Sequence, residues 1–264
     1  TTTVEKPDTS TGAILCVVGA RPNFMKIAPI IRAFRAGPDP IHTRLVHTGH
    51  HYDAKMNDAF FTQLQIPPPD IELGVGSASH AVQTAEVLKR FEPVVDAASP
   101  RAVLVVGDVN STIACALVAA KKNIPVIHVE AGLRSFDRAM PEEINRVLTD
   151  QISTLLFTTE PVACENLLRE GLDERQIHFV GNVMIDTLKH CLEQSVPAAK
   201  TLAGVPGREL FLDGDSGYCV LTLHRPSNVD EPRVFRQLLE TVRTVSESVP
   251  VVFPLHPRTR NRIS

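Results

Sequence analysis

The sequence predicts an α/β fold built on a doubly wound parallel sheet. Short apolar runs rich in β-branched residues recur along the chain, and segments of helical character separate them. Most of these runs are continuously apolar and do not alternate with polar residues, which is typical of strands covered by helices on both faces. Strands and helices that alternate in this way indicate βαβ units, whose strands lie parallel.

The apolar runs and the segments between them define the expected elements. Strands are expected at Ala13–Val18, Thr43–Thr48, Ala102–Val106, Pro125–Val129, Leu155–Thr159, Ile177–Val180, Cys219–Leu223 and Val251–Leu255. Helices are expected at Phe24–Arg35, Ser79–Ala97, Thr112–Lys121, Pro141–Gln151, Pro161–Gly171, Met184–Gln194 and Glu231–Ser248. The first six strands form one complete Rossmann-like unit, and only two strands follow it.

This distribution predicts two domains of unequal completeness. A polar tail, expected to be disordered, covers residues 1–12, and a Rossmann-like domain covers residues 13–194. Residues 195–217 are rich in Pro, Gly and Ala and are expected to form a linker. Residues 218–264 are then the start of a second Rossmann-like domain. A domain of this kind usually needs about 100 residues or more, so we expect it to be truncated.

Composition excludes several classes of protein. The formal net charge of −3 and the pI of about 6.3 argue against a nucleic-acid partner. The longest apolar stretch, Ala13–Ala20, falls short of the roughly 20 residues that cross a bilayer, and no leader precedes it. Five scattered cysteines favour neither a disulfide framework nor a CxxC metal site. We therefore expect a cytoplasmic protein that has no metal, no cofactor and no membrane partner.

In an open parallel sheet, ligands collect at the carboxyl ends of the strands, so the residues that follow each strand are the ones to inspect. After the first strand, Gly19 permits a tight turn and exposed N–H groups at the next helix start favour an anion. Arg21 and Lys26 add charges suited to phosphate. The alternative is an ordinary βα turn with two solvated cations.

A histidine-rich loop follows the second strand. His50 and His51 are adjacent, and Asp53 comes shortly after them. These residue types can bind a metal ion. Adjacent histidines often point apart, however, so a loop that contacts a ligand or a second subunit is the better interpretation.

Three carboxylates occupy neighbouring positions in the predicted topology. Asp108 follows the third strand, Glu130 ends the fourth, and Glu142 starts the next helix. The carboxyl ends of parallel strands meet at one edge of the sheet, so we expect these side chains to converge. Clustered carboxylates raise one another's pKa, which suits general acid–base catalysis near neutral pH.

Spacing adds two expectations about the same region. His128 and Glu130 are two residues apart on a strand and should share a face of the sheet. Glu142 and Arg146 are four residues apart and should share a face of the helix, where a salt-bridged helix start is the purely structural interpretation.

Basic residues follow both strands of the second segment. His224 and Arg225 come after the strand at Cys219–Leu223, and His256 comes after the strand at Val251–Leu255. With Arg258, they are expected to form the cationic wall of a phosphate-binding cleft between the domains.

These motifs, in this order, resemble the UDP-N-acetylglucosamine 2-epimerases, especially the non-hydrolysing bacterial kind. The specific part is His128-Val-Glu-Ala-Gly-Leu-Arg134 followed by Pro141-Glu-Glu-x-Asn-Arg146. The other motifs are Gly19-x-Arg-Pro-x-x-x-Lys26, Thr48-Gly-x-His-Tyr-Asp53, Gly107-Asp108, Gly181-Asn182, Ile185-Asp186 and His224-Arg225. The resemblance runs from about Ala13 to Leu255.

The resemblance implies two Rossmann-like domains in a GT-B-type arrangement, with the active site between them. It implies that UDP-GlcNAc and UDP-ManNAc interconvert without a metal or nicotinamide cofactor. A base removes the C2 proton, UDP leaves by anti elimination to give 2-acetamidoglucal, and UDP then adds back. It also implies a homodimer and a role in polysaccharide biosynthesis.

The resemblance also implies roles for particular residues. Asp108, Glu130, Glu142 and His224 are expected to serve acid–base catalysis or the departure of UDP. The substrate-binding set is expected to comprise Arg21, Lys26, Arg134, Asn145, Arg146, Arg225 and His256. His50, His51 and Asp53 are expected in a regulatory or subunit-contact loop, although many relatives have Gln at the position of His50.

Three other functions remain as alternatives. A hydrolysing epimerase would release UDP and free ManNAc, and a GT-B glycosyltransferase would share the architecture. The third alternative is a non-catalytic fragment that binds a UDP-sugar. It is motivated by the lack of a Ser-Gly-Gly…Glu-Glu stretch, which follows in the family and grips UDP.

Overall fold

The computed structural model describes residues 12–49, 61–208 and 217–263. Contacts divide the chain into two compact units, Thr1–Gln194 and Ser195–Ser264. Among the described residues, no helix combines the length and the apolar character that crossing a bilayer requires.

The first unit contains a parallel seven-stranded sheet in the order β3-β2-β1-β4-β5-β6-β7. The strands are β1 (Ile14–Val18), β2 (Thr43–Gly49), β3 (Ile71–Val75), β4 (Ala102–Val106), β5 (Val126–Ala131), β6 (Leu155–Thr158) and β7 (Ile177–Phe179). This confirms the predicted α/β class and parallel sheet. The order reverses between β1 and β4, which is the switch point where ligands bind in doubly wound folds.

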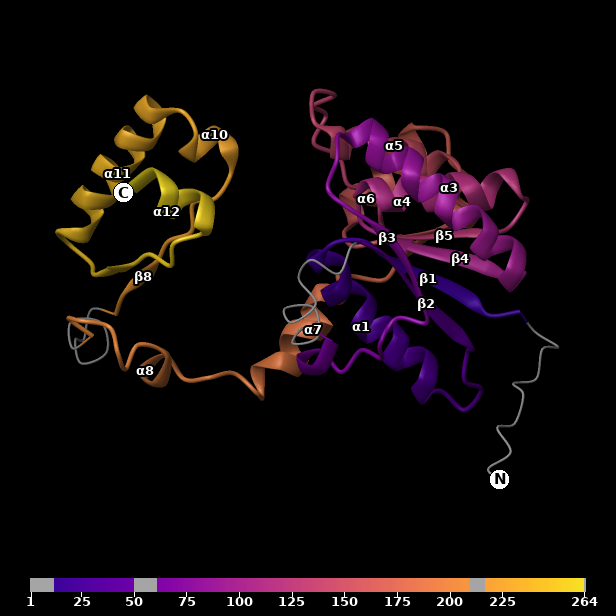
Figure 1. The fold of residues 1–264 in the computed structure, drawn as a ribbon, viewed down its shortest axis with the longest axis horizontal. Helices are drawn as coiled ribbons and strands as arrows, with labels where there is room; N and C mark the ends of the chain where they lie inside the picture. Colours follow the sequence, from indigo (N-terminus) through magenta and orange to yellow (C-terminus); the bar gives the residue numbers. More distant parts are fainter. Residues whose placement is uncertain (1–11, 50–60, 209–216, 264) are drawn as a thin grey trace. The chain divides into compact units, whose positions relative to one another are not determined.

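Helices cover both faces of this sheet (Figure 1). They are α1 (Arg21–Ala36), α3 (His80–Ala98), α4 (Asn110–Lys121), α5 (Pro141–Gln151), α6 (Pro161–Arg169) and α7 (Val183–Leu192), with a 3₁₀ turn at Glu174–Gln176. Helices α3 and α4 pack on one face and α1 packs on the other, beside α7. Buried residues alternate along β1 between these two cores: Leu15 and Val17 face α3 and α4, whereas Cys16 and Val18 face α1.

One strand of the first unit was not expected from the sequence. β3 is an edge strand whose pattern is interrupted by exposed Glu72 and by Gly74, which has a φ of +63°. An edge strand is buried less completely than a central one, so its sequence lacks the continuous apolar run that marks β1 or β4.

The second unit contains α8 (Ala198–Thr201), β8 (Cys219–Val220), α10 (Pro226–Val229), α11 (Pro232–Ser246), β9 (Val251–Val252) and α12 (Pro257–Ile263). β8 and β9 pair in parallel over two residues each, and are shorter than the five-residue strands that the sequence predicts. The short helix α8 lies within the segment expected to be a linker.

Candidate active site

Asp108 lies at the carboxyl end of β4, beside the switch point, and α5 holds it in place. The Arg146 guanidinium donates to Asp108 Oδ2 from Nε at 2.9 Å and from Nη2 at 2.6 Å. The Asn145 side-chain amide donates to the Asp108 backbone carbonyl at 2.8 Å. Two neighbouring residues of one helix therefore fix both the side chain and the backbone of this carboxylate.

The two glutamates at the start of α5 have different environments. The spacing of four residues suggested an ion pair between Glu142 and Arg146. In the structure, Arg146 Nη1 instead donates to Glu143 Oε2 at 2.9 Å. Glu143 is only 2% exposed and also accepts the backbone N–H groups of Ser135 and Phe136, both at 2.9 Å. Burial raises the pKa of Glu143, but these hydrogen bonds outweigh it and lower the pKa below its usual value. Glu143 thus anchors the loop that precedes α5.

Glu142 faces a pocket of about 220 Å³, and no side chain in the described part of the chain pairs with it. The pocket lies between the loops after β1 and β4 and the first turns of α3 and α5. Its lining is Gly19, Ala20, His80, Gln83, Asp108, Val109, Asn110, Ser111, Pro141, Glu142 and Asn145. Pockets for whole ligands usually have volumes of about 300–1,000 Å³, so this one suits only a part of such a ligand.

Glu130 pairs with Lys26 of α1. The pairing register of β5 with β6 shifts between Val129 and Ala131, and Glu130 between them has a φ of +74°. This bulge breaks the alternation of the strand. Glu130 therefore faces α1 whereas His128 faces α5, so the prediction that they share a face is wrong.

The Lys26–Glu130 pair lies against the end of β4. A Cβ atom at Gly107, which has a φ of +67°, would be 2.8 Å from Lys26 Nζ and 3.5 Å from Glu130 Oε2. The structure therefore brings Asp108 and Glu130 to the same edge, as expected. Each carboxylate has its own cation, however, so repulsion between carboxylates does not dominate the electrostatics of this edge.

The turn between β1 and α1 does not offer the N–H groups that the sequence suggested. Asn23 Oδ1 accepts the backbone N–H groups of Gly19 at 3.1 Å and Ala20 at 3.0 Å, and its amide donates to the Val106 carbonyl at 3.0 Å. Asn23 thus takes the place of an anion at this helix start. The side chain of Arg21 and the whole of His50, His51 and Asp53 lie outside the described residues.

Arg134 is buried in an ion network and does not line the pocket. Its side chain is 1% exposed, donates to Glu170 at 2.8 and 2.6 Å, and lies 2.8 Å from Asp150 Oδ2. This arrangement differs from the substrate-binding role that the sequence suggested for Arg134. Its guanidinium instead ties the loop after β5 to the end of α6.

In the second unit, His224 and His256 lie close together after β8 and β9. Their ring centroids are 5.8 Å apart, and both residues are exposed. The His256 Nδ1 atom accepts the backbone N–H of Arg258 at 3.2 Å, which leaves Nε2 free to carry a proton. Arg225 is exposed, and within the described residues its side chain has no ion-pair partner. The structure thus brings these two predicted histidines together within their own unit.

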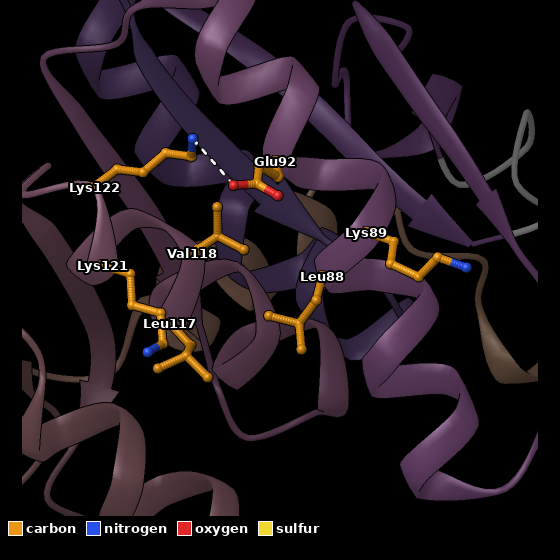
Figure 2. Close-up of a pocket in the computed structure, with 7 residues that line it drawn as sticks. All are labelled: Leu88, Lys89, Glu92, Leu117, Val118, Lys121 and Lys122. Atoms are coloured by element: carbon orange, nitrogen blue, oxygen red, sulfur yellow. Dashed lines mark ion pairs between the residues drawn. The ribbon is translucent and has the colours of Figure 1, made fainter.

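A second pocket, of about 290 Å³, lies between α3 and α4 (Figure 2). Its apolar part is formed by Leu88, Leu117 and Val118, and Lys122 pairs with Glu92 at 3.2 Å. None of the residues predicted for catalysis lines it. The pocket at the switch point is lined by the predicted catalytic residues Asp108 and Glu142, so it is the candidate active site.

Sequence reasoning missed the residues that support this site. Asn23, Glu143 and Asp150 are polar, almost fully buried and hydrogen-bonded to the ends of strands or to the loop before α5. The only sequence signal for them is a polar residue among helical positions that face the core. Such a signal does not distinguish a buried tie from a solvated side chain.

The fold and this pocket define a class: doubly wound α/β proteins with acidic side chains at the switch point of the sheet. Within that class, residues 35–264 match the family model described as UDP-N-acetylglucosamine 2-epimerase. The chain belongs to the UDP-N-acetylglucosamine 2-epimerase family.

Two relatives and one solved structure illustrate the match. A Methanococcus maripaludis protein named as a UDP-N-acetylglucosamine 2-epimerase homolog is 43% identical, over 94% of this chain and 66% of that protein. A Pseudomonas aeruginosa UDP-2,3-diacetamido-2,3-dideoxy-D-glucuronate 2-epimerase is 40% identical, over 95% of this chain and 68% of that protein. The crystal structure of Methanocaldococcus jannaschii UDP-GlcNAc 2-epimerase in complex with UDP-GlcNAc and UDP superposes with a TM-score of 0.78. The two sequences are 40% identical, and the match covers 95% of this chain and 68% of that chain. The chain thus spans about two-thirds of the length of these relatives.

Proposed function

We propose that the protein is a nucleotide-sugar 2-epimerase that interconverts UDP-GlcNAc and UDP-ManNAc. The observation that supports this most directly is the pocket at the switch point, because Asp108 and Glu142 both line it. Among the described residues, Glu142 has no ion-pair partner. Solved structures of relatives from Methanocaldococcus jannaschii and Neisseria meningitidis have UDP-GlcNAc bound. Family membership makes this sugar nucleotide the first substrate to test.

The proposed reaction moves one proton and one leaving group. A carboxylate takes the C2 proton, the electron pair of the C–H bond forms the C1–C2 double bond, and UDP leaves with the electrons of the C1–O bond. UDP then adds back to C1 of 2-acetamidoglucal while C2 is reprotonated on the other face. Atoms and electrons balance without an external oxidant or reductant.

Roles follow from charge and partners. Asp108, Glu130 and Glu142 are the candidates for proton transfer. Among them, Glu142 is the one with no cation partner in the described part of the chain, whereas Arg146 holds Asp108 and Lys26 holds Glu130. We assign the pyrophosphate to basic groups, because they stabilise the charge that develops on the leaving oxygen. In the first unit these groups are Lys26 and Arg21. In the second unit, His224, Arg225 and His256 form a basic group of their own.

Proton NMR of UDP-GlcNAc in D₂O with the protein tests this proposal. Deuterium at C2 with appearance of UDP-ManNAc supports the epimerase. Free ManNAc with UDP would instead indicate the hydrolysing reaction. Binding of the nucleotide by calorimetry without any exchange at C2 would indicate a binding protein and would overturn the proposed activity.

One observation favours a second substrate. The Pseudomonas aeruginosa relative named for UDP-2,3-diacetamido-2,3-dideoxy-D-glucuronate is 40% identical to this chain, close to the 41% of the Methanocaldococcus jannaschii relative named for UDP-GlcNAc. Overall identity therefore does not separate the two substrates. The same exchange experiment with both sugar nucleotides, compared by kcat/KM, distinguishes them.

We further propose that the protein works in the cytoplasm as a homodimer, in the synthesis of surface polysaccharide. All five cysteines are free thiols, which agrees with a reducing compartment. Light scattering tests the dimer: a mass of one chain at micromolar concentration would contradict it.

A further inference from the structure

A buried group of ionisable side chains connects the ends of β4 and β5. His128 and Asp150 are both fully buried, and His128 Nδ1 lies 2.6 Å from Asp150 Oδ1. On its other side, His128 Nε2 lies 2.9 Å from the Gly107 carbonyl oxygen. Asp150 Oδ2 accepts the backbone N–H of Gly132 at 3.1 Å and lies 2.8 Å from Arg134 Nη2.

Both ring nitrogens of His128 face acceptors. The Gly107 carbonyl oxygen can only accept, so Nε2 must carry a proton. An ionised Asp150 carboxylate can also only accept, so Nδ1 must carry one too. Burial raises the pKa of Asp150, but the charges and hydrogen bonds of His128 and Arg134 outweigh it and lower that pKa. With Asp150 ionised, the geometry fits an imidazolium–carboxylate pair inside the protein.

We propose that His128, held as an imidazolium by Asp150, is a positioning residue that clamps the carboxyl ends of β4 and β5. Its bond to Gly107 lies one residue before Asp108. The bond from Gly132 to Asp150 lies two residues after Glu130. The catalytic part of this inference rests on the proposed epimerase function, whereas the clamp itself does not.

The clamp acts at positions where the backbone needs support. Gly107 and Gly132 have φ values of +67° and +79°, and Glu130 near the end of β5 has a φ of +74°. Glycine adopts such a conformation freely, but at Glu130 it persists only where surrounding contacts hold it. Without the His128 side chain, the Gly107 carbonyl loses its donor, and the Asp108 carboxylate is free to shift relative to the pocket. Misplacement of a catalytic group by about 1 Å can cost about 100-fold in rate.

The first test reads the protonation state directly. In protein labelled with ¹⁵N-histidine, both ring nitrogens of His128 are expected to show imidazolium shifts with directly bonded protons at pH 8. Asp150→Asn should leave the ring neutral, with the proton on Nε2. A neutral His128 ring in the unaltered protein would overturn the proposal, because the proton would then belong to Asp150.

The second test separates positioning from general stability. Asp150→Asn is expected to lower kcat for C2 exchange by about 10- to 100-fold while KM stays within about twofold, since no substrate contact is removed. His128→Gln keeps one N–H donor for Gly107 and should retain more kcat than His128→Ala. Val95→Ala, on the buried face of α3, is the control for lost packing and should keep kcat. Unchanged kcat in Asp150→Asn would overturn the positioning role.

A third measurement keeps the clamp testable whatever the substrate. Amide hydrogen exchange at Gly107 and Gly132 should accelerate in Asp150→Asn more than exchange in the core strand β1. If the unaltered protein exchanges C2 of neither sugar nucleotide, the proposed function fails, but the ring-nitrogen and amide signals still decide the clamp. Equal acceleration at all these amides would overturn it.

Discussion

Lys26 of α1 and Glu130 of β5 form an ion pair at the carboxyl edge of the sheet, on the face opposite to the one that strand alternation assigns to Glu130. The reversal depends on a single bulged residue with a φ of +74°. Backbone geometry at one residue thus decides which helix the carboxylate meets. It places a charged pair beside Gly107 and next to Asp108.

This backbone conformation predicts an inverted preference at position 130. Glu130→Gly and Glu130→Ala both remove the ion pair, but only glycine adopts a left-handed conformation without steric cost. Glu130→Gly should therefore be more stable than Glu130→Ala by about 1 kcal/mol, measured by urea unfolding. Exposed Glu165 within α6 is the matched control, where alanine should be more stable than glycine by about 1 kcal/mol. The same order at both positions would contradict the left-handed conformation.

Close packing predicts a large penalty at Gly132. An added Cβ there would lie 2.4 Å from the backbone oxygen of Ala163, at a φ of +79°. Gly132→Ala should cost about 3 kcal/mol or more, because backbone atoms of α6 must move as well as the loop. Gly171 has a φ of +85° with no atom within 4 Å of an added Cβ, so Gly171→Ala should cost only about 1 kcal/mol of strain. Similar losses in the two variants would refute the close contact with Ala163.

The environment of Glu143 predicts a pH-dependent contribution to stability. Its folded-state pKa is lower than its usual value of 4.5, so its ionised form stabilises the fold above that pH. Glu143→Gln should lower the free energy of unfolding by about 1.5–3 kcal/mol at pH 7. The difference from the unaltered protein should shrink as the pH falls from 4.5 through the lower folded-state pKa, where Glu143 in the folded protein becomes protonated. Urea titrations at pH 7 and below pH 4 measure this, and a difference that grows on acidification would contradict it.

The central strands and the edge that carries the site were predictable, because burial on both faces leaves a continuous apolar run in sequences such as Ala102–Val106. Residues that closely follow such runs lie at the ligand-binding edge. The position of Asp108 at this edge was therefore predictable. The face of Glu130 was not predictable, since it depends on a bulge opposite β6.

The sequence also could not predict which of two adjacent glutamates pairs with Arg146. Glu142 and Glu143 both fit an ion pair with Arg146 by spacing, and only the position of the loop at Ser135 and Phe136 decides between them. In the same way, the N–H groups after β1 looked available for an anion. Asn23, the third residue of α1, occupies two of them, because its side-chain oxygen accepts the N–H groups of Gly19 and Ala20.

The unpaired state of Glu142 predicts a separation of activity from stability. Glu142→Gln removes no hydrogen bond or ion pair seen among the described residues, so its free energy of unfolding should stay within about 0.5 kcal/mol of the unaltered protein. If Glu142 transfers a proton at C2, the variant should exchange that hydrogen at least about 100-fold more slowly in D₂O. Exposed Glu160, which like Glu142 is adjacent to a proline at a helix start, is the matched control, and Glu160→Gln should keep full exchange. Full exchange in Glu142→Gln would remove Glu142 from the candidates and leave proton transfer to Asp108 or Glu130.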